Sequence, residues 1–247
     1  AAGDSPGPCP ALCKSYCDGT HAAVSRAQHF LRRSPYHLKL DIHKFFDSVD
    51  HAILTSLIER KVKDPEAMWL TKVIIDHQVP WTPRGKGLPI GNLTSQHFAN
   101  DYLSGLDHFV KEHLQVSGYL RYMDDMVLFD RQKEKLWRAA ERVERYLEEN
   151  LALRVKAGSV ILAPSLQGLS FLGFRIFPGV VRIQRKGWRR FRRKVAFRTH
   201  QVLTEVIDEA QWSRAMASLV GHMQHAATRN LRSAYFKGQG QYEATTA

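Results

Sequence analysis

The sequence is short of cysteine, of acidic residues and of long hydrophobic runs, and each shortage excludes a class of protein. Three cysteines in 247 residues cannot build a disulfide framework, so a reducing compartment is expected. No apolar run approaches the roughly 18 residues of a membrane span, and the first residues carry no signal-peptide core. We therefore expect a cytoplasmic protein without a membrane partner. The 24 acidic residues stand against 36 Lys and Arg, a net charge of +12, which favours a nucleic-acid partner.

The chain does contain a regular hydrophobic pattern, because 44% of its residues are apolar, as in ordinary globular proteins. At about 150 residues per domain, the length predicts one large domain or two modest ones. Apolar spacing predicts these elements: helices at Thr20–Arg33, after Asp50, from about Ser95 and at Lys133–Asn150, a half-buried strand at Tyr36–Ile42, a hairpin at Gly118–Phe129 and short strands in 154–177. Composition changes near Val180, which predicts a mixed α/β body followed by a basic helical part.

Three aspartates lie where predicted strands end: Asp41 after one strand, and Asp124 with Asp125 in the hairpin. Carboxylates that converge at strand ends repel one another unless cations lie among them, and Mg²⁺ prefers such hard oxygen ligands. Two ions about 4 Å apart would activate an attacking hydroxyl and stabilise a leaving oxygen in phosphoryl transfer. The alternative is that Asp124 and Asp125 only supply turn residues for the hairpin. The pair alone does not separate the two interpretations.

Four motifs, in the same order along the chain, resemble those of reverse transcriptases. Tyr122-Met-Asp-Asp125 resembles their metal-binding signature, and Leu40–His51 (Leu-Asp-Ile-His-Lys-Phe-Phe-Asp-Ser-Val-Asp-His) is similar to the first catalytic strand of group II intron-type enzymes. Gly87–Asn100 (Gly-Leu-Pro-Ile-Gly-Asn-Leu-Thr-Ser-Gln-His-Phe-Ala-Asn) resembles the next motif, and Phe171-Leu-Gly-Phe174 the primer-grip turn. The resemblance implies an α+β fold, with a right-hand polymerase palm of antiparallel sheet and packed helices, plus a helical thumb.

This resemblance implies an RNA-directed DNA polymerase that adds deoxynucleotides to a primer 3′-hydroxyl by two-metal catalysis. Asp41, Asp124 and Asp125 would be the catalytic ligands of two Mg²⁺ ions, which Mn²⁺ can replace, and the Ile42 carbonyl is an expected further ligand. Template RNA, primer and deoxynucleoside triphosphates are the implied partners, together with a small basic accessory protein. The family also implies a bacterial or phage-like cytoplasmic setting.

Five further residues are expected at the nucleotide by resemblance. Phe46 falls at the steric-gate position, where a ring would exclude a 2′-hydroxyl; a core aromatic is the alternative, as expected for Phe45. Ile90, Gly91 and Gln96 should lie under the templating base pair. Lys156 matches a lysine thought to protonate pyrophosphate in the family, although an ordinary surface lysine is the more common case. Asp47, Asp50 and His51 are expected to hold the following turn and to cap the next helix rather than to take part in the chemistry.

The subtype is indicated by Ile90, because most reverse transcriptases carry Gln there. The form Ile-Gly-Asn-Leu-Thr-Ser-Gln resembles reverse transcriptases of diversity-generating retroelements, which copy RNA with frequent errors. Isoleucine cannot donate an amide's hydrogen bonds, so a mispaired geometry loses less there, and low fidelity follows as a hypothesis. The alternatives are a group II intron-like or defence-associated bacterial reverse transcriptase, or a non-catalytic RNA-binding remnant.

A run of nine Lys and Arg without any acidic residue occupies 182–198, interleaved with Trp188 and Phe191. It resembles the first thumb helix, which lies along the template–primer duplex and binds phosphates without reading sequence. A solvated charged helix is the weaker alternative. The residues expected to bind nucleic acid are Arg182, Arg185, Lys186, Arg189, Arg190 and Arg193.

The expected organisation is a residual fingers segment at 1–35, a palm at 36–180 and a basic helical thumb at 181–247. Only about 40 residues precede Asp41, so we expect the fingers to be largely missing, as in a fragment, a mis-started frame or a degenerate copy. Such a chain lacks part of the positioning that catalysis needs, which leaves the activity of this chain alone open. Cys9, Cys13, Cys17 and His21 repeat every four residues, but zinc is the less favoured interpretation because Pro10 breaks their alignment.

Overall fold

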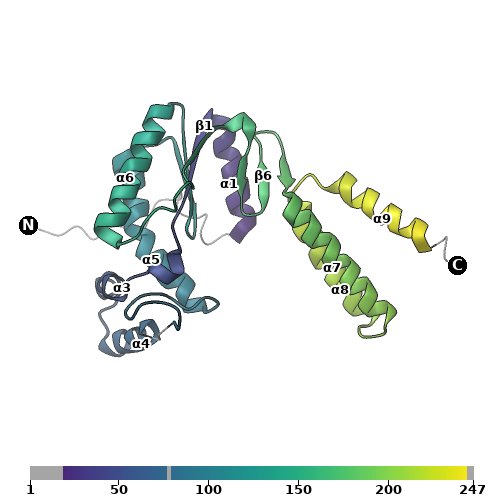
Figure 1. Ribbon diagram of the computed structural model, residues 1–247, viewed down its shortest axis with the longest axis horizontal. Helices are drawn as coiled ribbons and strands as arrows, with labels where there is room; N and C mark the ends of the chain where they lie inside the picture. Colours follow the sequence, from purple (N-terminus) through teal and green to yellow (C-terminus); the bar gives the residue numbers. More distant parts are fainter. Residues whose placement is uncertain (1–18, 77–78, 244–247) are drawn as a thin grey trace, which may run out of the picture. The chain divides into compact units, whose positions relative to one another are not determined.

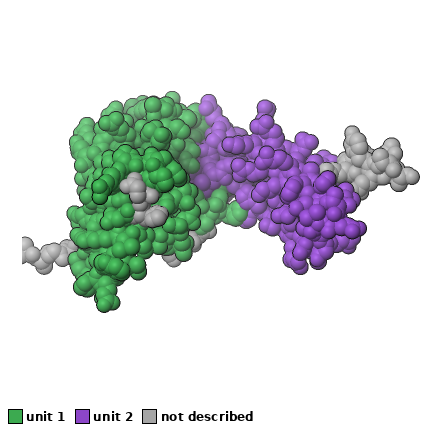
Figure 2. Space-filling model, turned by 60° about the horizontal axis from the view of Figure 1, so that its bottom comes forward, with its two compact units in different colours: residues 1–26, 33–164 green, residues 27–32, 165–247 purple. Residues whose placement is uncertain are grey.

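The computed structural model describes residues 19–76 and 79–243. The chain forms two compact units, which Figure 2 colours separately: residues 1–26 and 33–164, and residues 27–32 and 165–247. Cys9, Cys13 and Cys17 lie outside the described residues.

The first unit is built on a four-stranded antiparallel sheet in the order β2-β3-β1-β4. Its strands are β1 (Tyr36–Asp41), β2 (Gly118–Tyr122), β3 (Asp125–Asp130) and β4 (Ile161–Pro164). The hairpin β2–β3 is joined by the two residues Met123 and Asp124, so that Tyr122 is paired with Asp125. β1 lies between β3 and β4; its last residue, Asp41, is paired with β3, whereas the pairing with β4 extends only from Tyr36 to Lys39.

Helices of the same unit cover one face of this sheet, and α6 (Lys133–Leu151) packs on β1, β3 and β4 (Figure 1). α5 (Leu93–Phe109) packs against α6 and continues into the π-helical turn η2 (Val110–Leu114). The remaining helices are short: α2 (Phe45–Ser48), α3 (His51–Glu59) and α4 (Pro65–Ile75). The Asp50 carboxylate accepts hydrogen bonds from the Ala52 and Ile53 amides, so the cap predicted for α3 is confirmed.

Strand alternation separates the core from the site. Leu38 and Leu40 of β1 are paired with Leu128 and Met126 of β3, and all four are buried in the core shared with α5 and α6. The opposite face carries the alternate residues of β1, which end in Lys39 and Asp41. The aspartates at the end of this face therefore lie away from the main core.

The second unit contains a three-stranded antiparallel sheet and a helical part. The strands are β5 (Leu169–Phe171), β6 (Phe174–Ile176) and β7 (Val181–Ile183), preceded by the 3₁₀ turn η3 (Ser165–Gln167). Leu172 and Gly173, which join β5 to β6, both have positive φ, as a two-residue primed turn requires. The helices are α7 (Arg185–Leu203), α8 (Glu209–Gln224) and α9 (Arg229–Glu243).

A small apolar cluster joins the helices of the second unit. Phe191 and Val195 of α7 pack with Met216 and Met223 of α8, and the two helices lie side by side in Figure 1. Asp208 closes the start of α8 with a capping box to Gln211. Residues 27–32, from α1 (Gly19–Arg33), also group with this unit, where Arg32 Nε donates to the Pro178 carbonyl at 2.8 Å.

Most predicted elements are confirmed, with two differences. The strand predicted at Tyr36–Ile42 was expected to bury one face only, but His37 on the other face is also buried, at 3% exposed. Its ring lies 6.5 Å from that of Phe129, with which it is paired in the sheet. Arg182 lies on β7 rather than in the basic helix, which begins at Arg185. By contacts the chain divides after Pro164, whereas the functional division into fingers, palm and thumb stays a prediction.

Candidate active site

The candidate site is formed where β1 ends beside the β2–β3 turn. Asp41, the last residue of β1, is paired with Asp125, the first residue of β3. Asp124 precedes it in the turn, next to Met123, whose φ is +56°. Antiparallel register thus brings the backbone of Asp41 beside the turn that carries Asp124 and Asp125, which follow it by more than 80 positions in the sequence.

Two lysines lie within ion-pair distance of these carboxylates. Lys39 Nζ is 2.6 Å from Asp125 Oδ1, because alternation puts Lys39 and Asp41 on the same face of β1. Lys156 Nζ is 3.9 Å from Asp41 Oδ2, and the Lys156 side chain is exposed. Burial raises the pKa of the Asp124 carboxyl, and the charges of Asp41 and Asp125 raise it further, while its own backbone hydrogen bond and the Lys39 ammonium lower it.

A turn after α6 holds the backbone of Asp41. The Lys156 amide donates to the Asp41 carbonyl at 2.9 Å, and the Ser159 hydroxyl lies 3.3 Å from the Asp41 amide and 3.2 Å from its carbonyl. Ile42, the next residue, is buried and bridges Val155. These contacts fix the end of β1 and explain why Lys156 lies near Asp41.

The donor set suits a hard divalent cation, since three carboxylates that repel one another are stabilised by such an ion. Among the described residues, however, no three His, Cys, Asp or Glu side chains converge closely enough to hold a metal ion. Lys39 and Lys156 supply positive charge there instead. The oxygen ligands fit by their chemistry, and their side chains would have to turn from the lysines towards a shared ion.

Phe46 belongs to a segment that is tied to the motif at Gly87. The Leu88 amide donates to the Phe46 carbonyl, and the Gly87 amide to the Val49 carbonyl, both at 2.8 Å. Gly87 has φ +94°, and a Cβ on it would lie 2.8 Å from the Thr82 side chain, so glycine is required. Phe45 is 2% exposed, as predicted for a core aromatic. Phe46 is partly buried and packs edge-on against it.

The other residues expected at the nucleotide are solvent-accessible. Ile90 is 73% exposed in the loop before α5. Gly91 has φ +106°, and nothing lies within 4 Å of the position of a Cβ there. Gln96 is exposed in the first turns of α5. A nucleic acid could therefore approach this loop closely, and the roles of these residues stay predictions.

The six basic residues expected to bind nucleic acid are all exposed and belong to the second unit. Five of them fall on one side of α7, opposite Phe191 and Val195, which face the apolar cluster. The guanidinium of Arg182, on β7, lies 5.4 Å from the centre of the Phe177 ring.

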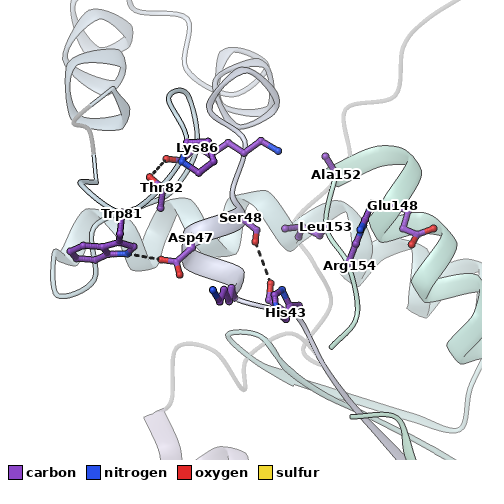
Figure 3. Close-up of a pocket in the computed structure, with 12 residues that line it drawn as sticks. His43, Asp47, Ser48, Trp81, Thr82, Lys86, Glu148, Ala152, Leu153 and Arg154 are labelled. Atoms are coloured by element: carbon purple, nitrogen blue, oxygen red, sulfur yellow. Dashed lines mark hydrogen bonds between the residues drawn. The ribbon is translucent and has the colours of Figure 1, made fainter. Parts of the chain in front are cut away.

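A separate cavity of about 850 Å³ opens beside α2, as Figure 3 shows. Its lining includes the basic residues Lys44, Lys86 and Arg154, the carboxylates Asp47 and Glu148, and the His43 side chain. Trp81 Nε1 donates to Asp47 Oδ1 at 3.1 Å across one side. None of the residues that the sequence predicted for catalysis or nucleotide binding lines this cavity.

A buried ion pair, which the sequence pattern did not predict, lies behind the hairpin. Arg121 of β2 and Asp107 of α5 have side chains that are 7% and 9% exposed and lie 2.6 Å apart. Arg121 also donates to the Met123 carbonyl, in the turn that carries Asp124. The signal was an arginine inside the apolar strand Gly118–Tyr122, but its partner, 14 positions earlier, could not be read from the pattern.

Together, an antiparallel sheet with helices on one face and aspartates at the end of two neighbouring strands define a polymerase palm. A family model described as reverse transcriptase (RNA-dependent DNA polymerase) matches residues 12–176, more than half of the chain. The chain therefore belongs to the reverse transcriptase family. The predicted α+β palm fold is confirmed.

Solved telomerase structures have a similar fold. The telomerase of Candida tropicalis in complex with a fragment of telomeric RNA aligns with a TM-score of 0.58 at 12% identity, over 94% of this chain and 45% of its own. Apo telomerase from the same species, truncated from its C-terminal domain, gives 0.53 at 16% identity, over 70% and 43%. Telomerase from Candida albicans gives 0.51 at 11% identity, over 67% and 33%.

This chain thus spans less than half of the length of these telomerase chains. No curated protein matches its sequence. Across residues 19–76 and 79–243, none of the helices is both long enough and apolar enough to cross a bilayer.

Proposed function

We propose that the protein is an RNA-directed DNA polymerase that extends a primer 3′-hydroxyl along an RNA template. The observation that carries this proposal is the pairing of Asp41 with Asp125, with Asp124 in the adjoining turn. Family membership supports the same reaction.

Asp41, Asp124 and Asp125, with the Ile42 carbonyl, would hold two Mg²⁺ ions. Bound ions would neutralise phosphate charge and lower the pKa of the primer hydroxyl. Lys156, 3.9 Å from Asp41, is suited to hold a proton for the departing pyrophosphate. The five exposed basic residues on one side of α7 would bind duplex phosphates. Phe46 would contact the sugar of the incoming nucleotide.

The primary test is Mg²⁺-dependent extension of a DNA primer on an RNA template. The Asp124→Asn variant should lose extension, whereas Asp101→Asn, an exposed carboxylate paired with Lys61, should keep it. Equal extension by Asp124→Asn would refute the site. Salt-sensitive RNA binding without extension by the wild type would instead support an RNA-binding protein without catalysis.

We further propose the error-prone type found in diversity-generating retroelements, because the exposed Ile90 cannot donate hydrogen bonds to a base pair. Ile90→Gln should lower the error rate, measured by sequencing the products. Leu93→Gln is the matched control, since Leu93 is also exposed, at 72%, but lies outside the expected contact. Identical error rates for the wild type and Ile90→Gln would remove the basis for this subtype and favour a group II intron-like or defence-associated enzyme.

A small basic accessory protein remains part of this proposal. It would be sought by comparing extension by the chain alone with extension in the presence of candidate basic proteins. Activity of the chain alone would make such a partner dispensable for catalysis.

A further inference from the structure

A buried polar network connects α5 to the turn that carries Asp124. The Arg121 guanidinium donates to both carboxylate oxygens of Asp107, from Nε at 2.8 Å and from Nη2 at 2.6 Å. Its remaining nitrogen, Nη1, donates to Asn100 Oδ1 at 3.2 Å and to the Met123 carbonyl at 3.1 Å. Tyr119 Oη donates to Asp107 Oδ1 at 2.7 Å.

Regular geometry assembles this network on the core side of the sheet. Tyr119 and Arg121 alternate on β2 and so point to the same face, towards α5. Asn100 and Asp107 lie seven positions apart on α5, two turns along one helix face. The network therefore approaches the β2–β3 turn from the face opposite to the one that carries Lys39 and Asp41.

The stability of the fold does not by itself explain why the charged pair Asp107–Arg121 is buried here. A buried ion pair is weak evidence for stability, because apolar residues of similar volume often serve as well or better. An apolar pair could not donate a hydrogen bond to the Met123 carbonyl, whereas the planar guanidinium can serve Asp107 and this carbonyl at once.

The turn also needs such support. Met123 has φ +56°, a left-handed conformation that is strained for a residue with a side chain and persists where its surroundings fix it. Rotation of this residue would displace Asp124, the next residue, relative to Asp41.

We propose that Asp107 and Arg121 are positioning residues that hold the Met123–Asp124 turn in the geometry needed for catalysis. Asp107 orients the guanidinium, and the guanidinium fixes the Met123 carbonyl. This inference rests on the proposed polymerase function for its kinetic consequence, but its structural part can be measured without it.

Arg121→Lys is the central variant, because an ammonium keeps the charge opposite Asp107 but carries its donors on one atom, whereas the guanidinium reaches Asp107 and the Met123 carbonyl from separate nitrogens. Asp130→Asn is the matched control. Asp130 is buried at the other end of the same hairpin, where its carboxylate accepts hydrogen bonds from Ser117 and Arg131. It stabilises the hairpin without contacting the turn.

The first readout is amide hydrogen exchange in the segment 119–126, measured on the full chain without nucleotide. Arg121→Lys should speed exchange there at least tenfold, while Asp130→Asn should speed exchange near Ser117 and Arg131 and leave the turn within twofold of the wild type. The second readout is primer extension, where Arg121→Lys should lower kcat about 10- to 100-fold and leave the KM for deoxynucleotide within twofold.

The proposal is overturned if Arg121→Lys matches Asp130→Asn in both turn exchange and kcat. If Arg121→Lys fails to fold, Asn100→Ala replaces it, since it removes one acceptor of Arg121 Nη1; it should show the same changes at smaller size, and unchanged turn exchange would overturn the proposal. If the wild type does not extend primers, the proposed function fails, and turn exchange still decides the positioning role.

Discussion

Replacement of Lys39 by Met should tighten divalent-metal binding at the three aspartates. Lys39 Nζ lies 2.6 Å from Asp125 Oδ1, and the two side chains are about a quarter exposed, at 23% and 27%. An ion at Asp125 must displace this ammonium or bind beside it. Methionine preserves the length of the apolar stem, so the substitution removes mainly the charge.

The magnitude follows from the partial exposure of the pair. Ion pairs of this kind contribute up to about 1 kcal/mol, and loss of the competing ammonium should therefore tighten binding by about fivefold, since 1.4 kcal/mol corresponds to tenfold. Because the Lys39 ammonium lowers the pKa of Asp124, its removal raises that pKa. Mn²⁺ binding is therefore compared at pH 8, so that protons compete with the ion at Asp124 as little as possible in both proteins.

The assay is a Mn²⁺ titration followed by electron paramagnetic resonance of the free ion. Lys61→Met is the matched control, because Lys61 pairs with Asp101 at 2.7 Å outside the site, and its affinity for Mn²⁺ should equal that of the wild type. The difference for Lys39→Met should shrink in 0.5 M salt, where charges are screened. Unchanged or weaker Mn²⁺ binding by Lys39→Met at pH 8 would refute the reasoning.

Three further predictions concern stability and nucleic-acid binding. Because the folded-state pKa of Asp124 is raised, the wild type loses stability as pH rises through that pKa. Asp124→Asn should therefore unfold at a higher urea concentration than the wild type at pH 7, and this difference should vanish below about pH 4. Equal urea midpoints at pH 7 would contradict the reasoning. Tyr102→Phe should lower the free energy of unfolding in urea by about 1–3 kcal/mol, because the buried Tyr102 hydroxyl donates to the Leu151 carbonyl at 2.7 Å. A loss below about 0.5 kcal/mol would show that this hydrogen bond is dispensable. Replacing Arg189 and Arg190 with Gln should flatten the salt dependence of RNA–DNA duplex binding by about 0.7–0.9 in log–log slope per lost contact, and an unchanged slope would exclude contact by α7.

The local elements of this protein follow from its sequence. The hairpin at 118–129, the helix after Gln132 and the strand ending at Asp41 each carry a period that depends on near neighbours only. Asp41, Asp124 and Asp125 could be named as candidate site residues from the sequence, because each belongs to a contiguous motif. Asp50 was likewise predictable as a cap from its position before α3.

The tertiary structure decided how these pieces meet. No local pattern could show that Asp41 is paired with Asp125, that Lys39 contacts Asp125, or that Arg121 reaches back to Asp107. Nor could it show that β5–β7 form a sheet of their own, within the compact unit that includes residues 165–247. Short strands specify their faces but not their partners, because partner choice is made by packing between segments far apart in the chain.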